Sequence, residues 1–161
     1  MAEAVYLTAA RAKQAVELAT PAILKLMESG LTHNKWIRIV VLGVEGQIIY
    51  EGNVGPDAGT AGKWLEESTL FARGKAAIHF RTGKPSIEAQ ARRPNALIVG
   101  DTIHGGSASY EGVIVAASGV QGYFDEAIAG TVAAILWGLC MDAQAKYMGK
   151  ADRKTFYEGA V

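Results

Sequence analysis

The residues of this chain that could do chemistry gather around one glycine-rich stretch, IHGGSASYEGVIVAASGVQG, which spans residues 103–122. His104 stands directly before Gly105 and Gly106, and a pair of glycines lets the backbone approach a ligand closely. Because a histidine exchanges protons near neutral pH, His104 is a candidate general acid or base. The alternative is an exposed histidine in a loop that leads into a strand.

The second glycine cluster of this stretch lies between an apolar run and a predicted helix. Gly119 and Gly122 precede the helix, and Asp125 follows near its start. A helix start offers free N–H groups and the positive end of the helix dipole, which could hold a carboxylate or a haem propionate. Asp125 could instead simply cap the helix. The loop has neither the Lys-Ser/Thr pair of a Walker loop nor the full GxGxxG pattern, so it gives little support for nucleotide binding.

A lysine and the two remaining histidines complete the set of candidates. Lys75 lies among small residues in RGKAA, on a predicted helix that should pack against a sheet. Its side chain would either extend outward or reach a buried anion. His79 on the same helix is either a packed residue or a ligand, whereas His33 lies in a loop and is expected to be solvated. With only Cys140 beside three scattered histidines, the case for a zinc site is weak.

Composition narrows the class of protein. The chain has 161 residues, half of them apolar, and its 16 basic and 16 acidic residues cancel. These values fit one domain and give no electrostatic reason to expect nucleic acid or an anionic membrane as a partner. A single cysteine cannot form an internal disulfide and is compatible with a reducing cytoplasm. The first residues lack the apolar segment of a signal peptide.

The elements that must position these residues follow the order helix, strand, strand, helix, strand, strand, helix. Tight turns at Glu45–Gly46 and Glu111–Gly112 predict two hairpins, and hairpins pair strands antiparallel. We therefore expect an α+β domain, with a profilin-like or PAS-like antiparallel sheet flanked by helices. The predicted segments are a helix over 8–29 that Pro21 kinks or breaks, strands over 36–43 and 48–52, a loop over 52–62, a helix over 63–80, strands over 107–110 and 113–120, and a helix over 124–148.

Three further segments are an apolar stretch, a short segment of undecided structure and the polar C-terminal tail. The apolar stretch 127–141 is too short and too rich in small residues to predict a membrane span, and we expect a helix buried on most of its faces. The segment NALIV at 95–99 is either a short strand or a turn of helix. One domain is predicted over residues 1–149, and the polar tail 150–161 either lies over a neighbouring element or frays.

Taken together, these segments resemble the GlcG/HbpS-like family, also called the haem-degrading domain and found as the C-terminal domain of PduO-type proteins. EGVIVAASGVQG is similar to the family's DGxVVGAIGVSG, with Glu111–Gly112 at the turn and Gly119 and Gly122 at two signature glycines. Gly105–Gly106 match a glycine pair that precedes this signature. The segment TLFARGKAAIHFRTGKPS resembles the family's KAxTAxxFxxPT, which places Lys75 on a matching position.

The resemblance implies a profilin-like fold, self-association as a dimer, tetramer or octamer, and haem binding in some members. We accordingly expect a cytoplasmic protein that binds haem or another small carboxylate-bearing ligand in a pocket near a subunit interface. A haem would need an axial donor, for which His104 and His79 are the candidates. The residues expected to bind the ligand are Lys75, Gly105, Gly106, Gly119, Gly122 and Asp125.

Two other functions stay open at this point. The chain could be an enzyme acting on a small organic acid, in which the glycine loop holds the carboxylate and His104 is the general acid or base. It could also be a non-catalytic assembly partner, with the alanine- and glycine-rich last helix and the tail segment TFYEGAV as contact surfaces.

Overall fold

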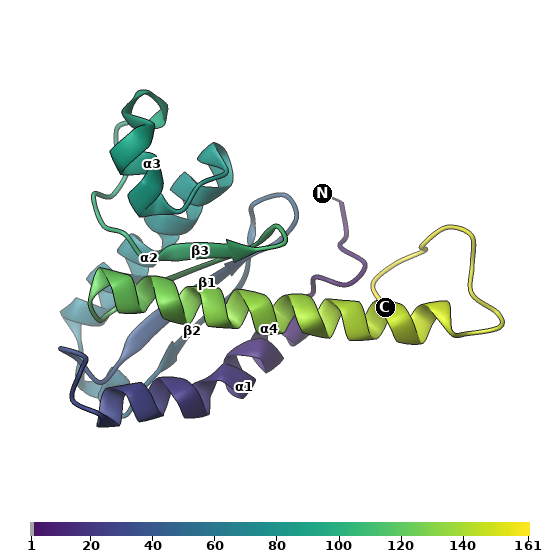
Figure 1. The fold of residues 1–161 in the computed structure, drawn as a ribbon, viewed down its shortest axis with the longest axis horizontal. Helices are drawn as coiled ribbons and strands as arrows, with labels where there is room; N and C mark the ends of the chain where they lie inside the picture. Colours follow the sequence, from purple (N-terminus) through teal and green to yellow (C-terminus); the bar gives the residue numbers. More distant parts are fainter. Residues whose placement is uncertain (1) are drawn as a thin grey trace.

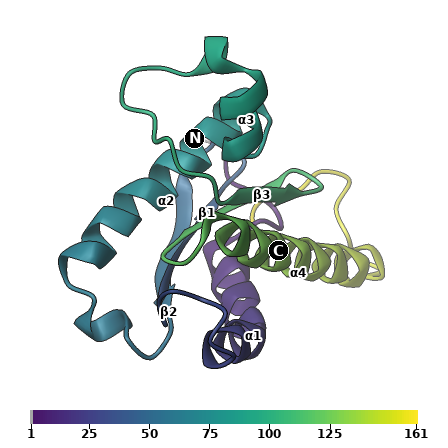
Figure 2. The ribbon, with the colours of Figure 1, turned by 60° about the vertical axis from the view of Figure 1, so that its left-hand side comes forward.

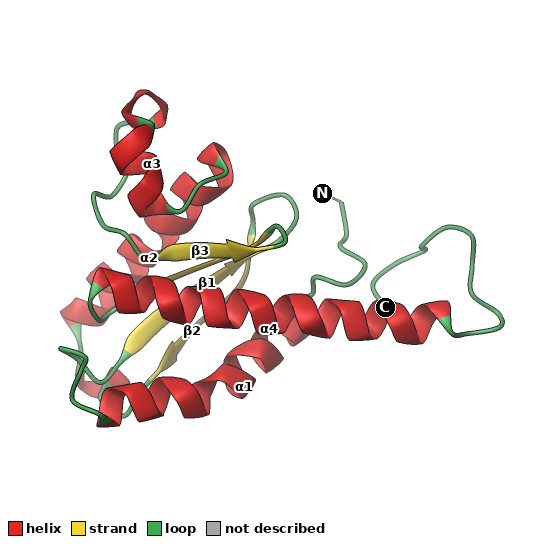
Figure 3. Cartoon of the chain, in the orientation of Figure 1, coloured by secondary structure: helices red, strands yellow, loops and turns green. Residues whose placement is uncertain are grey.

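Four antiparallel strands form the centre of the fold in the computed structural model, which describes residues 2–161 (Figure 1). The predicted α+β class, an antiparallel sheet flanked by helices, is confirmed (Figure 3). The strands lie in the order β2-β1-β4-β3. The elements are α1 (Ala9–Glu28), β1 (Ile37–Leu42), β2 (Ile48–Val54), α2 (Lys63–Thr82), α3 (Ser86–Arg92), β3 (Ser107–Tyr110), β4 (Val113–Ser118) and α4 (Gly122–Met148), with short 3₁₀ turns at Ala58–Thr60 and Pro94–Ala96.

Both predicted hairpins are present, and each depends on residues with positive φ. Gly46 has a φ of +78° between β1 and β2, and Glu111 and Gly112 have φ values of +47° and +83° between β3 and β4. Two consecutive positive values are what a type I′ turn requires. β1 and β4 then pair antiparallel and join the two hairpins into one sheet.

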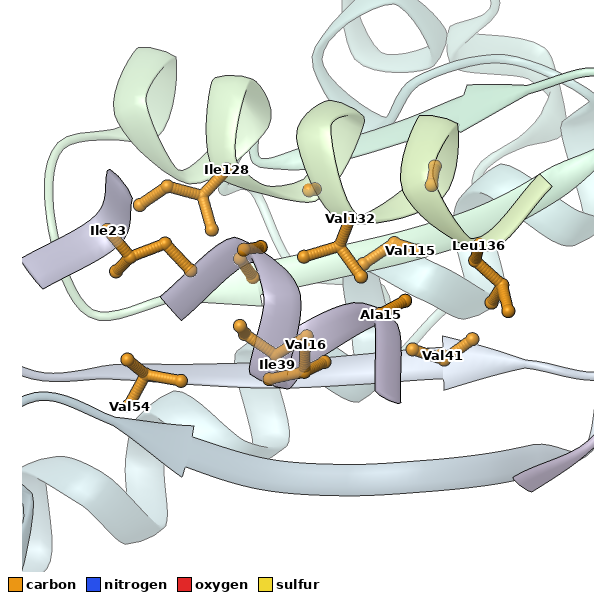
Figure 4. Packing of buried hydrophobic residues seen from close by; sticks show 14 of the residues in the cluster. Ala15, Val16, Ile23, Ile39, Val41, Val54, Val115, Ile128, Val132 and Leu136 are labelled. Carbon is orange, nitrogen blue, oxygen red and sulfur yellow. The ribbon is translucent and has the colours of Figure 1, made fainter. Parts of the chain in front are cut away.

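The two faces of the sheet are covered by different helices, because successive side chains of a strand point to opposite sides. Ile39 and Val41 of β1 belong to the larger core, which α1 and α4 cover (Figure 4). Val40 and Leu42 face the other way, into a smaller cluster that includes Ala72 of α2. Figure 2 shows α2 crossing the sheet on the side opposite α1 and α4. Any residue on the inner face of α2 is therefore held over the centre of the sheet.

The helix α1 begins as predicted, but Pro21 does not divide it. The Thr8 hydroxyl accepts a hydrogen bond from the Arg11 N–H and caps the first turn. The helix then continues through Pro21 to Glu28. Buried residues lie on both sides of the proline, including Ala19 and Ile23. Their packing against the core offsets the one backbone hydrogen bond that a proline removes.

The region between α2 and β3 differs most from the prediction. Residues 86–92 form α3, which the sequence analysis did not predict, because seven residues are too few to show a helical period. The segment 95–99 is not a strand: its first two residues belong to the 3₁₀ turn Pro94–Ala96, and a loop follows. The strand β2 also extends to Val54, two residues beyond the predicted strand.

The last helix, α4, is less covered than expected. Only 33% of its most apolar window is buried within the chain, so the prediction of burial on most faces is wrong. The whole helix has 27 residues and, unlike the stretch 127–141 taken alone, is by length and composition a candidate membrane span. One such helix is weak evidence for a membrane, because core helices pass the same test. Here α4 packs against β3, β4 and α1 (Figure 1).

The tail after α4 folds back on the start of the chain. The N–H of Val161 donates to the carbonyl of Val5 at 2.8 Å. The ring of Tyr157 lies 5.5 Å from that of Tyr6 and 5.4 Å from that of Tyr147, measured between centroids. The tail is thus placed against both the first residues and the end of α4.

Candidate functional site

A cavity of about 480 Å³ lies where β1 begins and β4 ends, between α2 and the first turn of α4. This volume falls within the range of small-molecule sites. Of the residues predicted to be catalytic, to bind the ligand or to ligate haem, all but Gly106 and His79 line it. The lining residues are Asn34, Trp36, Trp64, Glu67, Ser68, Phe71, Lys75, His104, Gly105, Ser118, Gly119, Val120, Gly122 and Asp125.

A buried ion pair forms part of the cavity wall. The Lys75 Nζ donates to Oδ2 of Asp125 at 3.0 Å and to the carbonyl of Ala117 at 2.8 Å. The side chains of the pair are only 2% and 3% exposed. Lys75 therefore reaches a buried anion and does not extend outward. The anion is a residue of the chain itself, 50 positions later in the sequence.

Asp125 also fixes the loop between β4 and α4. Its Oδ1 accepts a hydrogen bond from the Val120 N–H at 3.1 Å. The N-cap position of α4 belongs to Gln121, whose side chain makes no capping hydrogen bond. The carboxylate of Asp125 thus links three segments: the helix that carries it, the preceding loop and, through Lys75, the helix α2.

Burial has opposite effects on the two members of this pair. It is the largest influence on each, raising the pKa of Asp125 to about 6 and lowering the pKa of Lys75. The attraction between the two charges acts against burial in both residues. A proton therefore moves from the ammonium to the carboxylate at a lower free-energy cost than in an exposed lysine–aspartate pair.

Gly106 allows the loop before β3 to close over the ion pair. Its φ is +131°, and a Cβ there would lie 2.6 Å from the Asp125 Cβ, 2.8 Å from the Ala117 carbonyl oxygen and 2.9 Å from the Lys75 Nζ. Every one of these distances is too short for a real Cβ. The sequence predicts that Gly106 binds the ligand. The structure shows that a glycine is required there by the protein's own packing.

Aromatic side chains form the walls of the cavity, and sequence reasoning missed them. Trp36 is buried, whereas Trp64 is 60% exposed on α2. Trp64, Ser68, Phe71 and Lys75 follow one another at intervals of four, three and four residues and all line the cavity. This spacing places them on one face of a helix. The period was visible in the sequence and could have identified the wall.

An ionic cluster holds α2 in its place over the sheet. Arg73 of α2 donates through Nε to Oε2 of Glu51 on β2 at 2.6 Å, and Arg38 of β1 bonds to the same carboxylate. The hydrogen bond from Arg73 is the largest influence that lowers the pKa of Glu51, to about 2. Charge-assisted contacts of this kind fix the helix that carries the cavity wall.

His104 lies at the cavity on an exposed loop. Its ring packs against that of Phe71, with centroids 4.5 Å apart. The backbone of the residue is held by Thr102 and Gln90, since its N–H donates to the Thr102 hydroxyl and its carbonyl accepts from the Gln90 amide. Within residues 2–161, the structure gives the imidazole nitrogens no hydrogen-bond partner. The ring thus reaches the cavity, but no carboxylate orients it.

His79 lies outside the cavity, under β3. Its Nδ1 is 3.1 Å from the Ser107 hydroxyl and its Nε2 is 3.1 Å from the Ser109 hydroxyl. The side chain is fully buried, and burial lowers its pKa to about 4. The ring is therefore neutral at pH 7, with both nitrogens engaged. Ligation of a haem iron by His79 would require breaking one of these hydrogen bonds.

The pKa of His79 predicts how stability depends on pH. Between its ordinary value of 6.5 and about 4, the unfolded chain binds a proton that the folded chain does not. The contribution of His79 is hence complete above pH 6.5 and falls by about 3 kcal/mol as the pH drops to 4. We expect urea unfolding to show this loss in the wild type relative to His79→Gln, in which the titrating group is absent.

The matched control is His33→Gln, because His33 is an exposed loop residue. The titrations of Asp125 and Glu51 change the free energy of unfolding equally in the wild type and in both variants. Their contributions therefore cancel in the comparison. If the wild type and His79→Gln lose stability in parallel over this pH range, the assignment of a buried neutral imidazole is wrong.

No family model, curated protein or solved structure matches the chain in a comparison with known proteins. Among residues 2–161, no three side chains of His, Cys, Asp or Glu lie together in a way that could hold a metal ion. A function therefore has to be inferred from the cavity itself.

Proposed function

We propose that the chain is a cytoplasmic small-molecule-binding protein, and that its cavity takes a small ligand with a flat apolar body and a carboxylate. The observation that carries this proposal is a buried ammonium group in the wall of an aromatic cavity. Trp36, Trp64 and Phe71 offer apolar contact to the body of the ligand. Lys75 offers a charged donor to its polar end.

The hydrogen bonding of Lys75 leaves room for a ligand oxygen. An ammonium group has three N–H donors, and the protein accepts two of them, at Asp125 and Ala117. A ligand carboxylate could accept the third, in a charge-assisted hydrogen bond. Gly122, at the positive end of the α4 dipole, also lines the cavity. Because Asp125 and Glu67 add negative charge nearby, the site favours a single carboxylate over a polyanion.

Haem is the carboxylate-bearing ligand that the GlcG/HbpS-like resemblance implies. The structure offers the group a partial set of partners: aromatic walls for the macrocycle, Lys75 for one propionate, and the imidazole of His104 for the iron. His79 is engaged elsewhere. A haem held here would thus have His104 as its protein ligand.

Exposed apolar surface supports self-association as a dimer, tetramer or octamer. Trp64, which lines the cavity, and Tyr123, which lies beside Gly105 and Gly122, are 60% and 68% exposed. Large exposed apolar side chains at a site are typical of surfaces that bind a partner. Association through this surface would place the cavity near a subunit interface.

Binding is tested with two probes, benzoate and hemin. A ligand that binds only the folded chain raises the melting temperature. Trp64→Ala is expected to weaken benzoate binding about tenfold, because an aromatic contact contributes about 1.5 kcal/mol. For hemin, we expect a shift of the Soret band that His104→Ala removes.

The matched control is Leu70→Ala, which alters an equally exposed residue of α2 that does not line the cavity. It should bind both probes as the wild type does. Absence of any thermal shift with either probe would refute the proposed function, and so would equal losses of affinity in Trp64→Ala and Leu70→Ala.

A further inference from the structure

We propose that Lys75 is a nucleophilic amine, and that the ligand of the cavity carries an aldehyde or ketone carbonyl with which Lys75 forms an imine. This inference rests on the proposed function, since it takes the cavity as the site of a small carboxylate-bearing ligand. It adds the chemical class of that ligand, an oxo acid. It also places the reacting groups in the ion pair, whereas the sequence pointed to His104 as the general acid or base.

The geometry around the nitrogen supports nucleophilic attack. Nζ is bonded to its own side-chain carbon and makes hydrogen bonds to Asp125 and to the Ala117 carbonyl. One tetrahedral position of the nitrogen is left over, and Lys75 lines the cavity. After Asp125 has taken its proton, rotation about the Cε–Nζ bond brings the lone pair to this position, where it would meet a carbonyl carbon in the cavity. The same two protein contacts fix the nitrogen before the ligand enters, which keeps the entropic cost of attack low.

Asp125 is placed to handle the protons. Its Oδ2 lies 3.0 Å from Nζ, within reach for direct proton transfer. The other charged or titratable groups at the cavity are Glu67 on α2 and His104 on the loop before β3. Neither has a hydrogen bond to Nζ in the structure, so the carboxylate of Asp125 is the base that the amine meets.

The reaction balances with groups that the site contains. Asp125 takes a proton from the Lys75 ammonium, and the free amine attacks the carbonyl carbon, so that the C=O electron pair moves to oxygen. That oxygen receives the proton from Asp125 and forms a carbinolamine. Transfer of the second N–H proton through Asp125 to the hydroxyl releases water. The product is a protonated imine, whose positive charge the Asp125 carboxylate neutralises.

The environment favours the first of these steps. A buried lysine is activated as a nucleophile because desolvation disfavours its charged form. Burial lowers the pKa of Lys75 and raises that of Asp125 to about 6, so the two shifts add in bringing the proton toward the carboxylate. The chain also contains a natural comparison, the ion pair of Lys146 and Asp142, whose side chains are 74% and 59% exposed.

The test is reductive trapping with phenylpyruvate, an oxo acid with a flat apolar body. The folded wild-type chain is incubated with this probe and sodium cyanoborohydride, and each lysine is then quantified by peptide mass spectrometry. We expect Lys75 to be trapped at least tenfold faster than Lys146. In Trp64→Ala, trapping at Lys75 should slow at low probe concentration, whereas Leu70→Ala should match the wild type. Both variants alter exposed side chains, so neither is expected to unfold the chain.

The outcomes separate the two proposals. If Lys75 is trapped no faster than Lys146 while phenylpyruvate raises the melting temperature, the cavity binds oxo acids but the imine proposal is wrong. If neither trapping nor stabilisation occurs, while benzoate still stabilises the chain, the proposed function stands and the oxo-acid class is refuted. If none of these compounds has an effect, both proposals fail.

Discussion

Replacing Lys75 by methionine should lower the free energy of unfolding by about 3–5 kcal/mol at pH 7. This is the usual cost of removing one member of a buried ion pair. Methionine retains most of the length of the lysine side chain, so the main change is the loss of the ammonium group. Within residues 2–161, Asp125 would then be a buried carboxylate that keeps only backbone N–H donors from the loop before α4. Urea unfolding measures the effect directly.

The double variant Lys75→Met/Asp125→Leu is the control for this prediction. It removes both charges, and paired replacement of a buried ion pair costs far less than breaking it. We expect the double variant to be more stable than Lys75→Met alone. The cost of Lys75→Met should also shrink as the pH falls, because the isolated carboxyl group of Asp125 can then take up a proton. The pair is not coupled in solution if the separate losses of stability in Lys75→Met and Asp125→Leu add up to the loss in the double variant. A loss below 1 kcal/mol in Lys75→Met alone would show the same.

The second large effect is expected from Gly106→Ala. The added methyl group would lie within 3 Å of both side chains of the ion pair, at a φ that an alanine rarely adopts. Backbone strain and overpacking each cost about 1–3 kcal/mol, so we expect a total loss of about 3–5 kcal/mol in the free energy of unfolding. A loss of this size would identify Gly106 as the residue that lets the loop close over the pair.

Gly83→Ala is the matched control, since Gly83 also has positive φ, +68°, but has no neighbouring atom within 4 Å of the added Cβ. It lies at the C-cap of α2 in the left-handed conformation, where the change should cost about 1–2 kcal/mol. Equal losses in the two variants would mean that φ alone accounts for the effect. The proposed steric role of Gly106 would then be wrong.

The sheet could be predicted from the sequence because its signals are local. Turn residues at Glu45–Gly46 and Glu111–Gly112 separate short runs of β-branched residues, and such turns determine antiparallel pairing. The helix α3 could not be predicted in this way, because its seven residues carry no clear period. The apolar composition of α4 was also evident from the sequence. Composition does not determine which neighbouring elements cover a helix, so the exposure of α4 could not be predicted.

The candidate site was predictable only in part, for a related reason. The glycines and Asp125 lie in one stretch of sequence, and the structure does bring most of them to one cavity. The pairing of Lys75 with Asp125, in contrast, joins α2 on one face of the sheet to the start of α4 on the other. Such a contact depends on the order of strands and on which face each helix covers, and neither follows from local patterns.

If this cavity is the ligand site, NMR shift mapping should locate a bound ligand there. The chain has three tryptophans, of which Trp36 and Trp64 line the cavity, whereas Trp137 packs against Tyr110 elsewhere. In ¹⁵N-labelled protein titrated with benzoate, we expect saturable shifts of the indole signals of Trp36 and Trp64 and of the amides of Gly105 and Gly119. The indole signal of Trp137 should stay in place. Saturable shifts at Trp137 with none at Trp36 and Trp64, or no saturable shifts at all, would contradict this assignment of the site.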